Sequence, residues 1–280
     1  MTRTMPVLTL SLALGLALNA HSAAAQDRIP SHCIAVAESA PGLEYLHLAS
    51  FRDPLPDNTV RLSYVDHASF LLQTSGGLNA VTDFTGFIGN VDLIPDVVTM
   101  NHAHSTHWTA NPDPAIPHVL RGWGEEFGEG VEHYLDLGEM LVRNVPTDIR
   151  SFRGVETRGN SIFIFEVAGL CIGHLGHLHH EPDPMQYAAI GRLDVVMAPV
   201  DGGLTLDLET MMRVVGRLRS SVVIPMHWFG EATLARFVDG MRAEFAVVEE
   251  GAHSIELSLA SLPRQPTIVV LRPQRLREPD

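Results

Sequence analysis

Three groups of histidines directly follow apolar, strand-like segments, and this placement limits the folds open to the chain. The segments are 96–100, 170–173 and 221–226. The groups that follow them are His102, His104 and His107; His174, His177, His179 and His180; and His227. Residues two apart in an extended chain point to one side, so His102 and His104 can bind the same ion. Because the strands of a layered fold end at a shared edge where loops build sites, we expect the groups to meet there and to bind metal.

The rest of the chain alternates between strand-like and helical patterns without a repeat. Helices are predicted over 184–190, 207–219 and 231–244, and apolar residues of the second recur every three or four positions, which directs one face toward a sheet. Further strands are predicted over 60–65, 68–73, 78–82, 140–145, 161–167, 194–199, 254–259 and 267–271. Residues 108–137 are too long for a simple connection and are interpreted as a functional loop or lid. One domain, with helices covering a sandwich of sheets, is the simplest architecture.

The charge of the chain excludes some classes of partner. Its 280 residues carry 19 basic side chains, all of them Arg, against 33 Asp and Glu, for a formal charge of −14. So acidic a chain is a poor candidate for binding nucleic acid or an anionic membrane through its surface field. A hydrophobic fraction of 45% also excludes a disordered chain. We expect a globular protein that acts on a small-molecule substrate, with its oligomeric state left open.

The first 25 residues have the pattern of a cleaved secretory signal peptide. Arg3 supplies a positive charge, residues 6–18 are almost wholly apolar, and three alanines at 23–25 precede Gln26. The apolar run is shorter than the ~20 residues that a membrane helix needs, and no later stretch could span a membrane. We therefore expect a signal peptide over 1–25, a single domain over 26–280, and a periplasmic or secreted product.

The two cysteines, Cys33 and Cys171, have two possible states. An oxidising compartment permits a disulfide between them. A buried free thiol at Cys171 is the alternative, because sequence alone cannot set the distance between the two side chains.

Zinc is the metal that such histidines predict first. It takes imidazole nitrogen in tetrahedral sites, and a catalytic zinc keeps one position open for water. Iron, nickel and copper tolerate the same ligands. Close to the motifs in the sequence lie Trp108, Arg121 and Trp228, which suit a substrate with an apolar part and an anionic group. Core packing for the tryptophans and a solvated surface position for the arginine are the alternatives.

The segment His102-Ala103-His104-Ser105-Thr106-His107 resembles the metal motif H-x-H-x-D-H of the metallo-β-lactamase superfamily. Further segments resemble its branch of stand-alone hydrolases similar to L-ascorbate-6-phosphate lactonase. These are D-H-A-S-F-L at 66–71, T-D-F at 82–84, R-G-N-S at 158–161, H-L-G-H-L at 174–178 and P-M-H at 225–227. The matches run in the order of that branch from 60 to about 237. The resemblance implies an α+β fold, a four-layer αββα sandwich with metal at one edge of the paired sheets.

Two departures from the family pattern bear on the metal ligands. Thr106 stands where the family has a carboxylate, and His177 stands where it has a bridging aspartate. A carboxylate can bridge two cations, whereas a neutral imidazole has one lone pair to give. One zinc held by His102, His104 and His177 is one arrangement. A second site or a proton carrier formed by His107 and His227, with His179 or His180, is compatible with it, so one or two ions remain open.

The resemblance implies a metal-dependent hydrolase that uses metal-activated water on a lactone, ester, amide or phosphoester, with an acyl substrate preferred. In this interpretation Thr106 and His107 are the candidate catalytic residues. The candidate metal ligands are His102, His104, His107, His177, His180 and His227. Two alternatives are a non-hydrolytic member that binds metal or a small molecule, and redox chemistry at a metal other than zinc.

Overall fold

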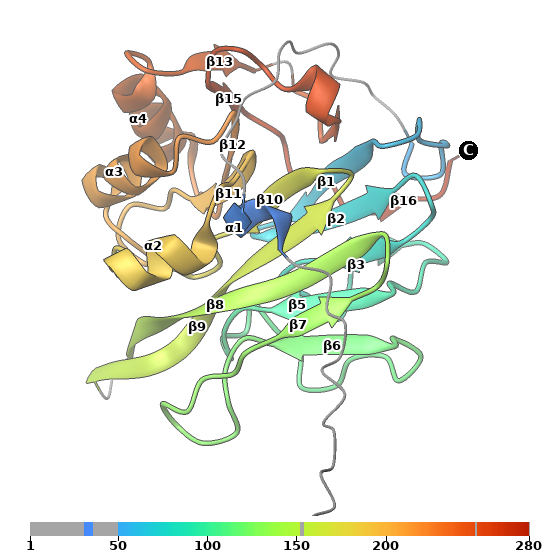
Figure 1. The fold of residues 1–280 in the computed structure, drawn as a ribbon, viewed down its shortest axis with the longest axis horizontal. Helices are drawn as coiled ribbons and strands as arrows, with labels where there is room; N and C mark the ends of the chain where they lie inside the picture. Colours follow the sequence, from blue (N-terminus) through green and yellow to red (C-terminus); the bar gives the residue numbers. More distant parts are fainter. Residues whose placement is uncertain (1–30, 36–49, 152–153, 250, 280) are drawn as a thin grey trace, which may run out of the picture.

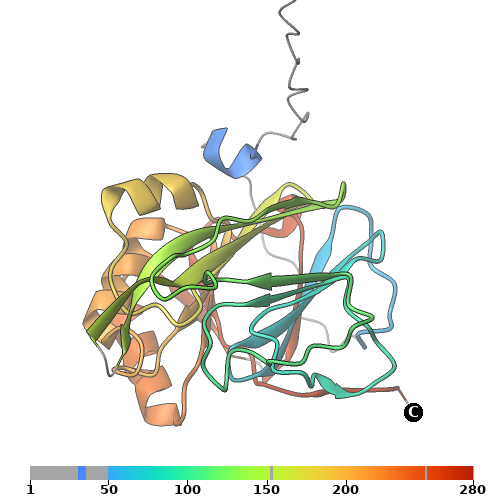
Figure 2. The same ribbon diagram turned by 90° about the horizontal axis from the view of Figure 1, so that it is seen from below.

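Two β-sheets lie face to face, and three helices cover the outer face of one of them (Figures 1 and 2). The computed structural model describes residues 31–35, 50–151, 154–249 and 251–279, so the predicted signal peptide at 1–25 lies outside the described residues. The helices are α2 (Pro184–Ile190), α3 (Leu208–Leu218) and α4 (Glu231–Met241), and a short helix α1 (His32–Ala35) precedes them. This arrangement is the predicted α+β sandwich, with helices close to their expected positions.

The first sheet has six strands in the order β14, β1, β2, β3, β5 and β6. Their bounds are β1 Val60–Asp66, β2 Ser69–Thr74, β3 Asn79–Val81, β5 Val97–Met100, β6 His118–Arg121 and β14 Ser254–Leu257. Strands β3, β5 and β6 run parallel to one another, whereas β2 pairs antiparallel with β1 and β3. The loop after β5 therefore leaves the sheet at the same edge as the loop after β3.

The second sheet has eight strands in the order β13, β15, β12, β11, β10, β9, β8 and β7. Their bounds are β7 Tyr134–Asp136, β8 Met140–Ser151, β9 Gly154–Val167, β10 Leu170–His174, β11 Val195–Pro199, β12 Val222–Met226, β13 Ala246–Val248 and β15 Thr267–Val269. Strands β10, β11 and β12 are parallel neighbours, so the loops that follow them also share one edge.

Apolar side chains on both faces of the central strands contribute to two separate layers of the core. Successive side chains of a strand point to opposite faces. On β9, Phe163 and Phe165 pack between the sheets, while Ile162 and Ile164 pack against the helices. Both faces of this sheet are therefore buried, which explains the nearly continuous apolar sequences of its parallel strands.

Loops and two short strands cover the outer face of the six-stranded sheet. Strand β4 (Gly89–Asn90) pairs in parallel with β16 (Leu276–Arg277), and the apolar side chains of this layer pack on the sheet. The buried members of the layer are Phe51, Val65, Leu71, Val81, Phe84, Ile88, Val98, Met100, Ile116 and Leu276. Within the described ranges, the fourth layer of the sandwich thus consists of loops and strands rather than of helices.

Residues 108–137 contain two strands where the sequence predicts only an irregular loop or lid. Strand β6 extends the first sheet beside β5, and β7 is the edge strand of the second sheet beside β8. Their short lengths, four and three residues, leave too little periodicity for recognition from sequence. The irregular part of the segment is therefore shorter than predicted, and a role of its loops as a lid stays a prediction.

A disulfide and a buried ion pair attach α1 to the second sheet. Cys33 bonds to Cys171 of β10, which resolves the alternative left open by the sequence. Glu166 of β9 accepts hydrogen bonds from Ser31 (2.5 Å) and from Arg143 of β8 (2.8 Å). Burial disfavours the charge of Glu166, but the hydrogen bonds from Arg143 and Ser31 outweigh it and hold the pKa of this carboxyl below its ordinary value.

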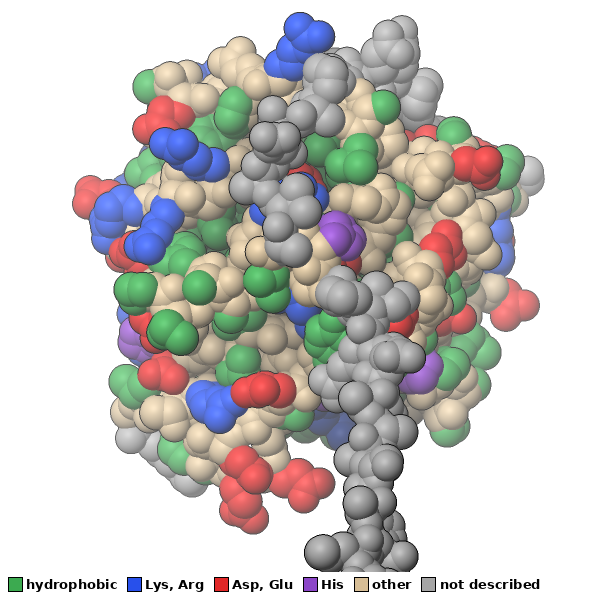
Figure 3. Space-filling view, viewed as in Figure 1, with side chains coloured by type: hydrophobic (Ala, Val, Ile, Leu, Met, Phe, Trp, Pro, Cys, Tyr) green, Lys and Arg blue, Asp and Glu red, His purple; other side chains and the backbone are tan. Residues whose placement is uncertain are grey.

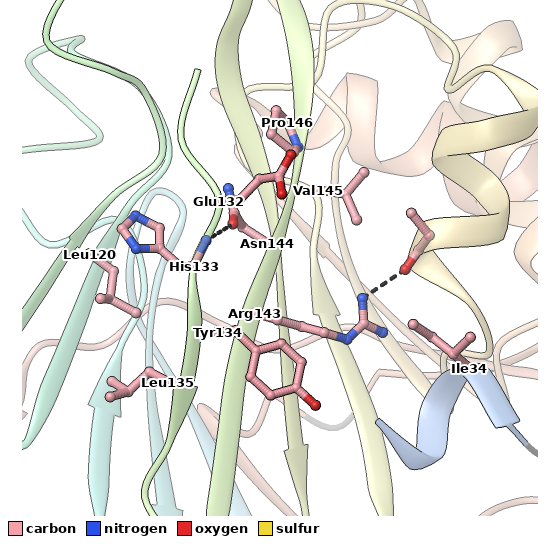
Figure 4. A pocket seen from close by; sticks show the side chains of 11 residues that line it. Ile34, Leu120, Glu132, His133, Tyr134, Leu135, Arg143, Asn144, Val145 and Pro146 are labelled. Atoms are coloured by element: carbon pink, nitrogen blue, oxygen red, sulfur yellow. Dashed lines mark hydrogen bonds between the residues drawn. The ribbon is translucent and has the colours of Figure 1, made fainter. Parts of the chain in front are cut away.

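A cavity of 780 Å³ lies beside this attachment (Figure 4). Its lining is Ile34, Leu120, Glu132, His133, Tyr134, Leu135, Arg143, Asn144, Val145, Pro146 and Ala189. Arg143 crosses it and donates to the carbonyl oxygen of Ala189 (2.7 Å). Because the lining contains none of the predicted site residues, this cavity is separate from the histidine groups.

On the face in Figure 3, arginine side chains are scattered among acidic and apolar ones. That pattern lacks the clustered positive charge by which proteins bind phosphate backbones. Among the described residues, there is also no helix with the length and apolar character needed to cross a membrane.

Loss of the disulfide will destabilise the protein. A cross-link between residues 138 apart in the sequence removes much of the conformational entropy of the unfolded chain, so Cys33→Ala/Cys171→Ala will lose roughly 2–5 kcal/mol of unfolding free energy. Urea denaturation followed by circular dichroism measures this loss. Reduced wild-type protein is the control, and equal midpoints for oxidised and reduced wild type would contradict the prediction.

The ion pair of Glu166 will make stability depend on pH. Since the folded-state pKa lies below the ordinary value of 4.5, its contribution is present above that pH and is lost as the pH falls through the folded-state pKa. Glu166→Gln leaves buried Arg143 without its charge partner and will cost about 3–5 kcal/mol at pH 7. Its unfolding free energy will fall less steeply on acidification than that of wild type. Exposed Glu244→Gln is the control, and parallel pH profiles for all three proteins would sink the idea.

Candidate metal centre

Histidines from all three groups meet at one edge of the sandwich. His107 follows β5, His177 follows β10 and His227 follows β12. The ring centroid of His107 lies 4.6 Å from that of His177 and 5.1 Å from that of His227. Parallel strands of both sheets deliver their carboxyl ends to this edge, the part of such sheets where ligands bind. The predicted meeting of the groups is therefore observed.

Two carboxylates hold the central pair of imidazoles. The Nδ1 atom of His107 lies 2.5 Å from Asp83 Oδ2, and the Nδ1 atom of His227 lies 3.0 Å from Asp201 Oδ2. The two Nε2 atoms lie 3.2 Å apart. The contact of His107 with Asp83 is a hydrogen bond, and an imidazole whose Nδ1–H donates to a carboxylate is fixed in the tautomer whose Nε2 lone pair is free for a metal. The contact of His227 with Asp201 has the distance of an ion pair but not the geometry of a hydrogen bond. All four side chains are buried.

Burial keeps the charges of this row in the state that a metal requires. It lowers the pKa of His107 well below 6.5, so this imidazole is neutral at pH 7. It raises the pKa of Asp83 to about 6, which still leaves a carboxylate at pH 7. Burial also disfavours the charge of Asp201, but the contacts with His227 and Thr205 outweigh it and hold the pKa of this carboxyl low. A neutral imidazole at His107 and anionic carboxylates at Asp83 and Asp201 are thus present together.

Two sets of three histidines bring their ring nitrogens within 4.8 Å of one another. One set is His67, His107 and His227, and the other is His104, His107 and His177. They share His107, whose Nδ1 is already held by Asp83. Because its Nε2 has one lone pair, His107 can serve one set at a time.

The residues of this cluster fit a divalent metal such as zinc. Tetrahedral zinc with Zn–N bonds of 2.0–2.1 Å places two ligand nitrogens about 3.3 Å apart, close to the 3.2 Å between His107 and His227. The Nε2 atom of His67 is buried and has no hydrogen-bond partner among the described residues. A buried imidazole nitrogen in that state is costly unless something binds it.

The backbone is strained at the same place. Three residues of the cluster adopt positive φ although they are not glycine, namely His67 (42°), Asp83 (42°) and His227 (56°). Such conformations cost on the order of 1–3 kcal/mol each and persist where the surrounding structure imposes them, often at functional sites. The conformation of Asp83 is held partly by a hydrogen bond, in which its Oδ1 accepts the backbone N–H of Asn101 (2.9 Å).

Several predicted ligands lie outside both sets. The motif 102–107 is a series of turns, with His104 N–H bonded to the carbonyl of His102 (2.8 Å), so the rule for an extended chain does not apply to it. His102 Nδ1 instead contacts the carbonyl oxygen of Gly159. His180 is half-buried and also lies outside the sets. Metal binding by the predicted residues stays a prediction.

The other positions of the two motifs have structural partners. Thr106 is exposed, and its Oγ1 lies 3.2 Å from His104 Nδ1. His177 Nδ1 lies 2.8 Å from His179 Nε2. His174 is fully buried, and its Nε2 lies 2.7 Å from the carbonyl oxygen of Ala68. His174 thus connects β10 with the turn before β2.

The three predicted substrate-binding residues are distributed around the cluster. Trp108 packs edge-on against Trp123 (5.7 Å between centroids) in the outer loop layer. Trp228 packs on the helix side, with the guanidinium of Arg272 5.5 Å from its ring. Arg121 is exposed at the end of β6. Contact of these three residues with a substrate stays a prediction.

Sequence reasoning missed three residues of the site. His67 lies in the turn after β1, within the segment D-H-A-S-F-L, which served only as a resemblance to the family and not as a source of ligands. Asp201 follows β11 by two positions, and a polar residue just after a buried strand was the available signal. Phe229 is 66% exposed, yet its ring lies 5.2 Å from that of His67. A single exposed phenylalanine carries no pattern that could have identified it.

Comparison with known proteins identifies the class. Residues 61–227 match the family model of the beta-lactamase superfamily domain, so the chain belongs to the metallo-β-lactamase superfamily, as its motifs predict. A UPF0173 metal-dependent hydrolase of Methanosphaerula palustris is 25% identical over 189 residues, covering 60% of this chain and 84% of the relative. One of Methanospirillum hungatei is 25% identical over 183 residues, with 60% and 83% covered.

Solved structures agree on the fold. A candidate Zn-dependent hydrolase of the metallo-β-lactamase superfamily from Thermotoga maritima gives a TM-score of 0.55 at 24% identity, covering 76% of this chain and 98% of its own. The metallo hydrolase Igni18 of Ignicoccus hospitalis gives 0.52 at 18% identity, covering 71% and 99%. The predicted sandwich is thereby confirmed.

Asp201 will be needed for tight metal binding. Asp201→Asn can keep the bonds that Oδ1 accepts from the backbone N–H groups of Gly203, Leu204 and Thr205, but it replaces the oxygen beside His227 Nδ1 with an amide nitrogen. Loss of such a support lowers metal affinity by about 10–100-fold. Competition with a chromophoric zinc chelator measures this change. Exposed Glu209→Gln on α3 removes a charge without touching the site, and an equal effect of both variants would refute the role of Asp201.

Proposed function

We propose that this chain uses metal-activated water to hydrolyse a lactone, ester or amide. In coarser terms it is a metal-dependent hydrolase of the metallo-β-lactamase superfamily. The observation that carries the proposal is the buried pair of imidazoles, His107 and His227, with each Nδ1 against a carboxylate and their Nε2 atoms 3.2 Å apart. A divalent ion bound there would acidify water and polarise the scissile carbonyl.

The residues around the pair have separable tasks. Asp83 is hydrogen-bonded to Nδ1 of His107 and holds that ring in place, and Asp201 lies beside Nδ1 of His227. His104, the exposed member of the second set, can receive or give a proton at the mouth of the site. The face of Phe229 beside His67 offers an apolar surface to a substrate side chain. These tasks favour a substrate with an apolar group next to the bond that is cleaved.

Charge supports an acyl substrate over a phosphoester. Arg or Lys side chains commonly help a metal to stabilise the negative charge of a phosphoryl group. Arg150, next to His179, donates to the carbonyl oxygen of Thr205 (2.5 Å) and so already has a partner. The charged partners that the structure gives the central pair are the carboxylates of Asp83 and Asp201. We therefore place phosphoesters second.

We infer zinc as the metal and export as the destination. Zinc is supported by the 3.2 Å between Nε2 of His107 and Nε2 of His227, which is close to the distance between two nitrogens bound to one tetrahedral zinc. The disulfide between Cys33 and Cys171 supports export, because disulfides persist in oxidising compartments such as the periplasm. The predicted signal peptide is consistent with it.

Metal removal and one substitution test the proposal. Chelated wild-type protein will lose turnover of a panel of lactones, esters and amides, and zinc will restore it. His107→Ala will lower kcat/KM by about 10³-fold or more, since it removes a group that binds the ion. His118→Ala, at the start of β6 and the opposite end of that strand from the site, is the control and will retain activity. Absence of turnover in zinc-loaded wild type across the panel would refute hydrolysis and leave a binding protein.

A further inference from the structure

We propose that His67 is a ligand of the bound ion, and that the ion lies between His67, His107 and His227. His67 then supplies the third ligand that the family obtains from a carboxylate at the position of Thr106. The inference rests on the proposed function only in taking this ion to be the one used in hydrolysis. It extends that function by assigning a ligand outside the histidine motif of the family.

The position of His67 suits this role. Its ring centroid lies 3.9 Å from that of His227 and 5.4 Å from that of His107. The ligand nitrogens of the three residues lie within 4.8 Å of one another. Its Nε2 is buried and finds no partner within the part of the chain that the structure describes. A ligand-binding role explains an imidazole nitrogen that is both shielded from water and unbonded.

The protein backbone holds His67 against His227. The carbonyl oxygen of His67 accepts hydrogen bonds from the Tyr64 hydroxyl (2.5 Å) and from the backbone N–H of His227 (2.9 Å). The same tyrosine oxygen lies 3.3 Å from that backbone nitrogen of His227. These bonds fix the turn between β1 and β2, where His67 has a φ of 42°. Because this turn is hydrogen-bonded to the residue that follows β12, the side chain of His67 has little freedom to move.

The alternative set has a more exposed ligand and fewer carboxylates beside its imidazoles. His104 is exposed, and its Nδ1 shares a contact with Thr106 Oγ1. His177 Nδ1 lies against the imidazole of His179 rather than against a carboxylate, so His177 lacks the kind of anionic partner that His107 has. His107 has a single free nitrogen, which already lies 3.2 Å from His227 Nε2. Of the two sets, the one with His67 thus has the more buried ligands and includes both imidazoles that lie against carboxylates.

The assignment leaves His104 and His177 free of metal. His177 stands at the position of the family's bridging aspartate, and without a bridge a second ion has no shared ligand. We therefore expect one ion per chain, with His104 and His177 facing the substrate side of the cluster.

Zinc titration of the metal-free full chain, in competition with a chromophoric chelator, tests the assignment. His67→Ala will weaken zinc binding by about 100-fold or more, since a lost ligand costs at least as much as a lost outer partner. His67→Gly will do the same without backbone strain, because glycine adopts positive φ freely. His104→Ala and the matched control His118→Ala, at the far end of β6 from the cluster, will stay within about threefold of wild type. Elemental analysis of wild type will give one zinc per chain.

A second readout reports the ligands themselves. Cobalt(II) bound to wild type will give the intense visible absorption of a tetrahedral site, and His67→Gly will change its position and intensity while His104→Ala will not. Thermal melts of the metal-free variants establish that each is folded. Zinc affinity lost in His104→Ala but kept in both His67 variants would overturn the assignment. Hydrolysis is measured separately, so zinc binding through His67 without turnover would refute the proposed function and leave the ligand assignment intact.

Discussion

The buried row Asp83, His107, His227 and Asp201 is the interaction on which this site depends. Two of its members follow strands of the six-stranded sheet and two follow strands of the eight-stranded sheet. Buried carboxylates are costly unless they are paired, and each one here has an imidazole and at least one backbone N–H as partners. The row therefore fixes the relative position of the two sheets at their shared edge.

The loops around this row hold it in place through hydrogen bonds and through strained backbone conformations. Asp201 Oδ1 accepts three successive backbone N–H groups, those of Gly203, Leu204 and Thr205. These bonds order the loop between β11 and α3, and they orient Oδ2 toward His227. The backbone of His67, Asp83 and His227 is held at positive φ, a conformation that is strained for residues other than glycine. The apolar layers on either side of the second sheet supply the stability that tolerates such strain.

Sequence patterns predicted the elements that are long and periodic, and the family motif predicted the edge where the site forms. They failed where side-chain direction depends on contacts between distant segments. His102 and His104 follow a strand, but the chain turns at once, so spacing by two no longer places them on one side. His67 was overlooked because a turn residue gains its role only when β1 lies beside the end of β12. Strands β6 and β7 were too short to carry a period.

Charge balance explains why the family carboxylates can be absent here. Two divalent ions need bridging or directly bound anions to offset four positive charges at close range. This cluster holds imidazoles, which carry no negative charge, and two outer carboxylates, Asp83 and Asp201, whose combined negative charge offsets the charge of one divalent ion. With Thr106 and His177 in place of aspartates, a second ion would be left uncompensated in a buried site. Under the proposed assignment, the replacement of two family carboxylates by Thr106 and His177 and the recruitment of His67 would be two parts of one change, from a shared pair of ions toward a single ion with imidazole ligands.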